Sequence, residues 1–182
     1  MLADKPEEKI LAFRCHWCSY GGADMAGTSH FEYSSNERGI RVMCSARMDA
    51  DFIYEAFRLG AGAVLFSGCH PQDCHYITGQ RVGAHRAERL LKRFERMGMT
   101  PGRFRVEWIS AAQGDKYARV INEMQEVLDS IPREELLKEI EEFRPEMAKR
   151  ARRMREVPQI EEASDFAESI ADARRTREAE PA

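Results

Sequence analysis

The sequence predicts an α/β protein: a small flavodoxin-like or Rossmann-like sandwich with a four-stranded parallel sheet and a C-terminal helical extension. Three observations predict this fold. Short apolar runs alternate with amphipathic helical patterns along residues 9–130, which is the order of βαβ units. One run, Ala61–Ser67, is almost wholly apolar, as a strand buried on both faces must be. Hydrophobic residues make up 43% of the 182-residue chain, enough for a packed core.

Four segments have the composition of strands, and four helical patterns separate or follow them. The predicted strands are Lys9–Cys15, Ile40–Cys44, Ala61–Ser67 and Phe104–Ile109. The predicted helices are Ala23–Thr28 after Gly21–Gly22, Asp49–Leu59, Ala84–Met97, and the Val120–Leu128 stripe after a capping box at Ser110–Gln113. Asp49 is suited to cap its helix, and Gly60 and Gly98 are suited to end the two helices before them.

The composition changes near residue 131, which predicts an α/β domain at 1–130 and a charged helical extension at 131–182. The second part lacks Gly, Cys, His and Trp and is rich in charged residues. One amphipathic helix is predicted at Arg133–Phe143, broken before Pro145. A basic run, Lys149–Arg155, and a mixed tail follow. This tail is either solvated helix and disorder or an arm that orders on an acidic partner surface.

Charge and hydropathy exclude several classes of protein. The chain carries 28 basic and 31 acidic residues, a formal charge of −3, so no basic field draws it to nucleic acid. No apolar run is long enough to span a membrane. The N-terminus is acidic and lacks the apolar core of a secretory signal. We therefore expect a cytoplasmic protein, in a compartment that keeps thiols reduced.

All five cysteines lie in the first 74 residues and follow the predicted strands. They are Cys15, Cys18, Cys44, Cys69 and Cys74. An odd number cannot all pair in intramolecular disulfides, and clustered cysteines in a reducing compartment indicate metal-binding or redox chemistry. Because the carboxyl ends of parallel strands form one edge of a sheet, where ligands bind, we expect the five thiols to converge there.

The spacing of these thiols suits a soft metal. Cys15 and Cys18 have C-x2-C spacing, and Cys69 and Cys74 have C-x4-C spacing, which also occurs in plant-type [2Fe–2S] sites. Four thiolates satisfy either a zinc ion or a [2Fe–2S] cluster, and the fifth would be spare. A dithiol oxidoreductase acting through Cys15 and Cys18 is possible, but it leaves the other three without a role.

Residues beside the cysteines have further predicted roles. Each of His16, His70 and His75 adjoins a cysteine. They are expected to donate hydrogen bonds to the cysteine sulfurs and so tune the reduction potential of a bound metal centre, rather than to bind the metal themselves. Trp17 and Tyr20 could shield a cluster from water. No nucleophilic triad, paired-carboxylate site or dinucleotide fingerprint is evident, so no organic substrate site is expected on this chain.

Four stretches resemble one known family. They are CHWCSYGGADMAGTS (15–29), IRVMCSARMD (40–49), GAVLFSGCHPQDCHY (62–76) and EWISAAQGDKYA (107–118). Together they are similar to the delta subunit of methyl-viologen-reducing hydrogenase, over about residues 9–130. Residues 131–182 lie outside the resemblance.

The resemblance implies a protein with one [2Fe–2S] cluster and no catalytic site of its own. Such a protein relays electrons from a hydrogenase or a formate dehydrogenase to the flavin-bearing A subunit of heterodisulfide reductase. That reductase component performs flavin-based electron bifurcation in methanogenesis. The resemblance places the ligands among the five cysteines, and we favour Cys44, Cys69 and Cys74 with one of Cys15 and Cys18. The electron donor, the reduction potential and the oligomeric state stay open.

Overall fold

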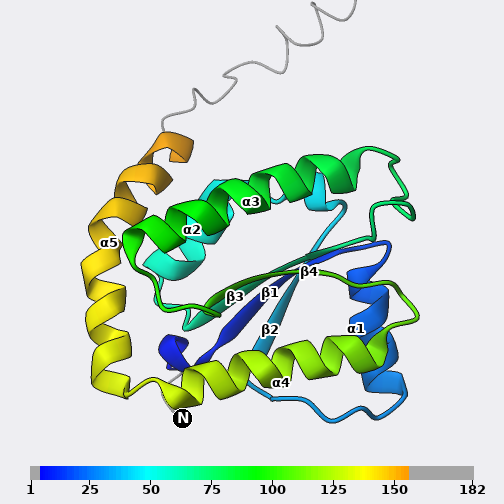
Figure 1. The fold of residues 1–182 in the computed structure, drawn as a ribbon, viewed down its shortest axis with the longest axis horizontal. Coiled ribbons are helices and arrows are strands. Elements are labelled where there is room, and N and C mark those ends of the chain that lie inside the picture. Colours follow the sequence, from blue (N-terminus) through cyan, green and yellow to red (C-terminus); the bar gives the residue numbers. More distant parts are fainter. Residues whose placement is uncertain (1–4, 156–182) are drawn as a thin grey trace, which may run out of the picture. The chain divides into compact units, whose positions relative to one another are not determined.

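The computed structural model describes residues 5–155, without the side chains of 150–155. It contains a four-stranded, all-parallel sheet between layers of helices (Figure 1). The elements are η1 (Pro6–Glu8), β1 (Ile10–Cys15), α1 (Ser19–Thr28), β2 (Glu37–Val42), η2 (Ser45–Arg47), α2 (Ala50–Arg58), β3 (Ala63–Gly68), α3 (Gly79–Met97), β4 (Phe104–Trp108), α4 (Gly114–Ser130) and α5 (Arg133–Arg155). The strand order β2-β1-β3-β4 is that of the first four strands of a flavodoxin-like sheet, so the predicted fold class is confirmed.

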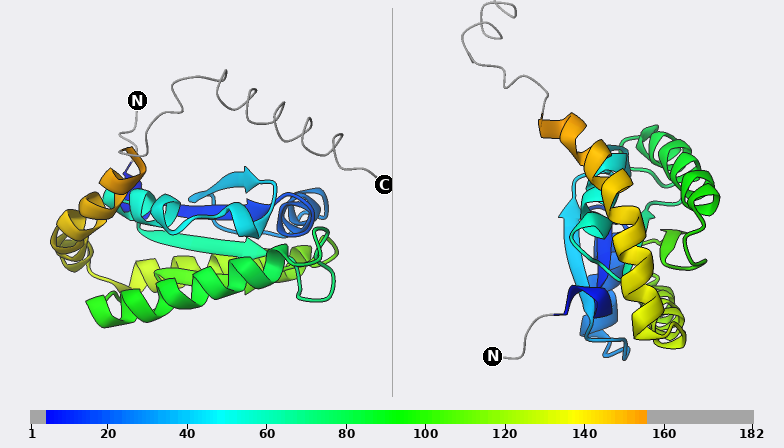
Figure 2. Two further views of the ribbon diagram at one scale, coloured as in Figure 1. Left: turned by 90° about the horizontal axis from the view of Figure 1, so that it is seen from above. Right: turned by 90° about the vertical axis from the view of Figure 1, so that its left-hand side faces the viewer.

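Two apolar clusters pack against the two faces of the sheet. Helices α2 and α3 cover one face, where Phe13, Val64 and Phe66 join the first cluster. Helices α1 and α4 cover the other, where Ala12 and Leu65 join the second. The views in Figures 1 and 2 show these two layers on either side of the strands. Burial on both faces explains the unbroken apolar sequence of β3, every residue of which is buried.

The second strand differs from its prediction, and this changes the position of Cys44. Strand β2 pairs with β1 from Glu37 to Val42, rather than spanning residues 40–44. It is an edge strand with mostly exposed side chains. Its sequence therefore lacks the run of apolar residues that marks a buried strand. Cys44 is therefore not in the strand but two residues beyond it, at the N-cap of η2.

Two helices begin earlier than predicted. Helix α1 starts at Ser19 and includes both Gly21 and Gly22. A Cβ on Gly21 would lie 2.9 Å from the Ala111 Cβ, and one on Gly22 would lie 2.8 Å from the Ser110 carbonyl oxygen. These glycines thus let α1 pack closely against the loop after β4, instead of opening the helix. Helix α3 likewise starts at Gly79, five residues before the predicted start.

The other helix boundaries follow capping chemistry with one exception. Asp49 caps α2 by accepting from the Asp51 N–H, and Gly98 ends α3 with φ of 77°, as predicted. Only half of the predicted capping box forms, because the Gln113 side-chain oxygen accepts from the Ser110 N–H at 2.9 Å. It forms in the loop and does not start the helix, since α4 begins only at Gly114.

Helix α5 does not break at Pro145, contrary to the prediction. It runs continuously from Arg133 to Arg155, although the proline ring removes one backbone hydrogen bond. Tertiary packing outweighs that loss, because Leu136, Ile140 and Met147 are all buried. The division between domains at residues 130 and 131 stays a prediction, and the tail from 156 to 182 lies outside the described residues.

A buried ion pair holds α5 against the amino ends of the strands. Arg103 is 1% exposed and lies just before β4. Its guanidinium donates to the Gly62 carbonyl at 2.7 Å and to Glu139 of α5 at 2.6 Å. Glu139 also accepts from the Thr100 N–H at 3.0 Å. Helix α5 therefore crosses the end of the sheet opposite to the cysteines, as the right-hand view of Figure 2 shows.

Candidate metal centre

The fold brings cysteines from three separate connections, those that follow β1, β2 and β3, to one edge of the sheet. Cys15 ends β1, Cys69 directly follows β3, and Cys18 is the N-cap of α1. Cys44 is the N-cap of η2, and Cys74 lies in the loop before α3. All five are free thiols, and three of them are buried. Since β1 and β3 are parallel neighbours, their carboxyl ends place Cys15 and Cys69 side by side.

Cys15 and Cys69 form the closest thiol pair. Their sulfurs are 3.5 Å apart, and each residue is 1% exposed. The hydrogen-bond contact between the two thiols, in which either sulfur can be the donor, lowers the pKa of Cys15 to about 6 despite burial. The same contact raises the pKa of Cys69. In this pair one sulfur is therefore readily anionic, as a metal ligand must be.

Cys44 and Cys74 form a second pair around Gly79, the first residue of α3. Their sulfurs lie 2.4 and 3.4 Å from the position that a Cβ on Gly79 would take, so they cannot be farther apart than the sum of those distances. Backbone N–H groups point at both sulfurs, from Ala46 to Cys44 at 3.4 Å and from Gln80 to Cys74 at 3.2 Å. Burial raises the pKa of Cys44.

Cys18 lies between these pairs. It is 9% exposed, and burial raises the pKa of its thiol. The thiol of Cys69 interacts with it directly, and negative charge on Cys15 or Cys74 would raise its pKa further. The five thiols are thus close enough to influence one another's ionisation, which the sequence spacing predicted only through the strand ends.

Helix N-termini add positive potential at this edge of the sheet. Helix α1 begins directly after Cys18, and α3 begins five residues after Cys74. Both helices direct the positive ends of their dipoles toward the thiols, and such ends stabilise anions. The N–H groups of Trp17 and Cys18 also lower the pKa of Cys15. The environment therefore favours thiolates over neutral thiols.

Buried polar atoms beside the cysteines lack partners. Among the described residues, three buried side-chain nitrogen or oxygen atoms make no hydrogen bond: Arg14 Nε, His16 Nδ1 and Ser45 Oγ. Each belongs to a residue adjacent in sequence to Cys15 or Cys44, although the Arg14 side chain binds Tyr117 on the opposite face of the sheet. Because buried polar groups are normally hydrogen-bonded, the unpartnered Ser45 hydroxyl next to Cys44 fits a bound group that carries an acceptor at the thiols.

The two thiol pairs described above offer four thiolates at one edge of the sheet. Four thiolates can bind either a [2Fe–2S] cluster, with two on each iron, or a zinc ion. Metal binding by these residues stays a prediction.

The three predicted histidines lie around the site without touching sulfur. His70 Nε2 is 2.8 Å from the Gln113 side-chain oxygen, and His75 stacks on Trp17 with ring centroids 3.7 Å apart. The His16 ring meets the edge of Trp17 at 4.9 Å. No hydrogen bond joins these histidines to a cysteine in the described residues, so their predicted role in tuning the potential stays a prediction.

An exposed apolar rim surrounds the thiols. We define it as Trp17, Met43, Tyr76 and Ile77, which are 41%, 55%, 45% and 84% exposed. Trp17 packs edge-on to Tyr76 at 6.4 Å. Ile77 has φ of 61°, a left-handed conformation that is costly for a β-branched residue. Trp17 therefore belongs to an open surface rather than to a closed shield. The apolar side chain of Ile77 lies in solvent, on a backbone that is itself in an unfavourable conformation.

Tyr20, the other predicted shield, lies between two cations. The guanidinium carbons of Arg14 and Arg41 are 5.4 and 5.0 Å from its ring centroid, which is cation–π distance. Arg14 is held by Glu37 at 3.7 Å. Arg14 also donates to the Tyr117 hydroxyl of α4 at 3.3 Å, so Tyr20 belongs to the side of the sheet that α1 and α4 cover, whereas Cys15 packs in the cluster on the other side.

Sequence reasoning missed four residues that shape the site: Ser45, Gly79, Gly83 and Gln113. One signal could have revealed the two glycines. They are four residues apart and therefore lie on one face of α3, which indicates a close approach by another segment. That segment is η2, because a Cβ on Gly83 would lie 2.8 Å from the Ser45 oxygen. No sequence signal distinguishes Ser45 from an ordinary serine.

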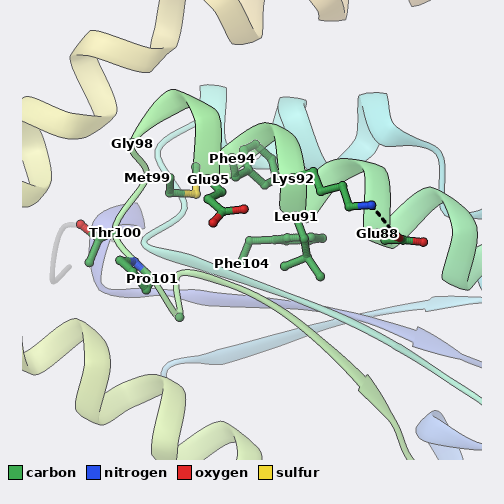
Figure 3. A pocket seen from close by; sticks show the side chains of 11 residues that line it. Glu88, Leu91, Lys92, Phe94, Glu95, Gly98, Met99, Thr100, Pro101 and Phe104 are labelled. Atoms are coloured by element: carbon green, nitrogen blue, oxygen red, sulfur yellow. Dashed lines mark hydrogen bonds and ion pairs between the residues drawn. The ribbon is translucent and has the colours of Figure 1, made fainter.

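A pocket lies at the carboxyl end of α3, away from the thiols. Its volume is about 710 Å³, and Leu91, Met99 and Phe104 contribute apolar walls (Figure 3). Leu91 is twelve residues along α3 from Gly79, which is about 18 Å at the rise of a helix. None of the five cysteines lines this pocket.

Comparisons with known proteins agree with the resemblance in the motifs. The sequence family described as methyl-viologen-reducing hydrogenase, delta subunit, matches residues 10–131, which hold all five cysteines. The chain belongs to this family. The match begins at β1 and ends just after α4, so α5 lies outside it.

Two hydrogenase proteins match the delta-subunit chain along most of their own length. One is the vhc iron–sulfur D subunit of the F420-non-reducing hydrogenase of Methanococcus voltae. It is 40% identical over 130 residues, 71% of this chain and 90% of that protein. The other is the iron–sulfur D subunit of the F420-non-reducing hydrogenase of Archaeoglobus profundus. It is 39% identical over 122 residues, 67% of this chain and 89% of that protein.

A third relative contains the same region within a much larger chain. It is the A subunit of the ferredoxin/F420H2-dependent CoB-CoM heterodisulfide reductase of Methanosarcina acetivorans, which is 43% identical over 122 residues. The match covers 67% of this chain but only 15% of that protein.

In the part of this chain that the structure describes, no helix is long and apolar enough to cross a membrane.

Proposed function

We propose that this delta-subunit chain binds one [2Fe–2S] cluster and relays single electrons between an oxidoreductase and heterodisulfide reductase. The observation that carries the proposal is the convergence of five thiols, from the three connections after β1, β2 and β3, at the carboxyl edge of the sheet. The iron–sulfur names of the two hydrogenase relatives support it. When bound, the cluster supplies reversible one-electron transfer, with no organic substrate on this chain.

We propose Cys15, Cys69, Cys44 and Cys74 as the ligands, with one pair on each iron. The 3.5 Å contact between the Cys15 and Cys69 sulfurs supports the first pair, and the shared packing of Cys44 and Cys74 on Gly79 supports the second. Cys18, at the N-cap of α1, is then the fifth thiol and stays beside the cluster. Backbone N–H groups aimed at the sulfurs would stabilise the added negative charge on reduction.

We propose that the apolar rim is the surface through which an electron partner docks. Electron transfer requires a partner close to the thiols, and the rim is the exposed surface around them. The partner that fits is a protein like the A subunit of heterodisulfide reductase, because one relative carries this region inside such a chain. The electron donor is proposed as a hydrogenase or a formate dehydrogenase, and the basic run from Lys149 as a contact for an acidic partner surface.

A reconstituted electron-transfer chain tests this function. The flavin-bearing A subunit is mixed anaerobically with the donor enzyme and the full delta-subunit chain, with hydrogen or formate as the reductant, and flavin bleaching is followed. The Cys69→Ser variant should abolish bleaching, while the Ser67→Ala control, two residues away, should retain it. Bleaching that survives Cys69→Ser would contradict the relay and favour a dithiol reaction of Cys15 and Cys18.

A further inference from the structure

We propose that the Ser45 hydroxyl donates a hydrogen bond to a sulfur of the metal centre and thereby raises its reduction potential. This inference rests on the proposed function, because it requires a thiolate-bound cluster. Ser45 belongs to η2 and directly follows Cys44. It is a positioning and tuning residue, since it would neither bind a substrate nor ligate iron.

Ser45 is fully enclosed by two glycines. It is 0% exposed. A Cβ on Gly68 would lie 3.1 Å from the Ser45 oxygen, and a Cβ on Gly83 would lie 2.8 Å from it. One glycine ends β3 and the other belongs to α3, so two elements leave room for this side chain. The packing therefore holds the hydroxyl at the edge of the sheet where the thiols meet.

The hydroxyl lacks a hydrogen-bond partner in the described residues. A buried hydroxyl without a partner is less favourable than alanine at the same position, because its desolvation is uncompensated. The neighbouring acceptor is sulfur. Cys44 directly precedes Ser45, and its sulfur accepts from the N–H of Ala46, the residue that directly follows Ser45, at 3.4 Å. The Cys44 sulfur therefore lies against the short segment that carries the Ser45 hydroxyl.

Two other buried serines near the cysteines differ in this respect. The Ser67 hydroxyl donates to the Phe13 carbonyl at 2.9 Å. The Ser19 hydroxyl lies 3.1 Å from the Ser67 carbonyl, to which it donates. Both are 0% exposed, as Ser45 is, but their hydrogen bonds belong to the protein backbone. Only the Ser45 hydroxyl, among these three, is available to a bound group.

The proposed effect follows from charge. Reduction adds one electron, supplied by the redox partner, and the charge spreads over iron and sulfur. A donor to sulfur stabilises the reduced state more than the oxidised state, which raises the potential. Removing the donor should therefore make reduction harder without changing the ligands.

The test is a redox titration of the full-length wild type and of Ser45→Ala and Ser67→Ala, monitored anaerobically by EPR. We expect Ser45→Ala to shift the equilibrium against reduction by about three- to tenfold, where tenfold in a one-electron couple is about 59 mV. Ser67→Ala, also buried and isosteric, should keep the wild-type potential. Should Ser45→Ala take up no iron, Ser45→Gly gives the same measurement, because it also removes the hydroxyl.

The outcomes separate this inference from the proposed function. An unchanged potential in a loaded Ser45 variant would overturn the role of the hydroxyl and leave the relay intact. Equal shifts in Ser45→Ala and Ser67→Ala would overturn it too, because they would reflect general packing. A wild-type protein without an iron–sulfur signal would remove the proposed function, and this inference with it.

Discussion

Gly79, the first residue of α3, leaves room for the sulfurs of the proposed ligands Cys44 and Cys74, and its replacement by alanine tests whether this close packing is required. A Cβ at this position would lie 2.4 Å from the Cys44 sulfur. Non-bonded heavy atoms normally approach to about 3.5–4.0 Å, so the sulfur must move by more than about 1 Å. That displacement would take Cys44 away from the position that a shared iron with Cys74 requires.

Two opposing energies set the expected stability of Gly79→Ala. Alanine in a helix gains at most about 0.5–1 kcal/mol over glycine, and less at the first position of α3. Overpacking costs about 1–3 kcal/mol. We therefore expect the free energy of unfolding of the metal-free protein to fall by about 0–2 kcal/mol, with the fold retained. Iron content should fall much more, because ligand geometry is less tolerant than packing.

The assay compares iron per chain after anaerobic reconstitution with unfolding by urea. The control is Gly27→Ala, in α1, where a Cβ would meet nothing within 4 Å. This variant should keep its iron and gain slightly in stability. A Gly79→Ala protein with wild-type iron content and potential would refute the placement of Cys44 and Cys74 as a ligand pair around this residue.

Three further predictions concern other parts of the chain. Glu139→Ala leaves the Arg103 guanidinium buried without its partner, so the free energy of unfolding should fall by about 3–5 kcal/mol in urea denaturation. Cys18→Ser should keep its iron and the wild-type EPR spectrum, whereas Cys69→Ser should lose the cluster, as measured by iron analysis. Ile77→Asp should weaken binding of the reductase partner by at least about tenfold in a pull-down titration, because it places a charge in an apolar interface.

Matched variants give these predictions their controls. Glu142→Ala removes a carboxylate from the same helix that faces Lys138 at 3.9 Å and is exposed, so it should change stability little. Leu59→Asp changes an apolar residue that is 61% exposed at the end of α2, outside the rim, and should leave partner binding unchanged. Iron loss in Cys18→Ser would reassign the ligands, and equal effects of Ile77→Asp and Leu59→Asp would exclude the rim as the docking surface.

The sheet and its central strands are predictable because buried strands consist of apolar residues. The apolar run predicts β3 correctly, and Asp49 and Gly98 predict the start of α2 and the end of α3 correctly. Strand β2 begins and ends earlier in the sequence than predicted, because an edge strand with exposed side chains carries no apolar pattern. The continuation of α5 through Pro145 was missed, since the compensating burial of Met147 is a tertiary contact that no local pattern reveals.

The site was predictable at the level of residue type and strand end, and not below it. Parallel strand topology was enough to bring Cys15 and Cys69 together. The position of Gly79 between two sulfurs depends on where α3 begins, which the apolar stripe of that helix does not show. The unpartnered hydroxyl of Ser45 depends on three segments at once, so only the folded structure reveals it.

The most direct test of the central claim is the iron, sulfide and EPR signature of the purified chain under anaerobic conditions. The proposal predicts two irons and two inorganic sulfides per chain, as the cluster formula requires. On reduction, it predicts one S = 1/2 EPR signal per chain that titrates as a one-electron couple. A colourless protein with stoichiometric zinc, or a metal-free protein with a reversible dithiol, would contradict it.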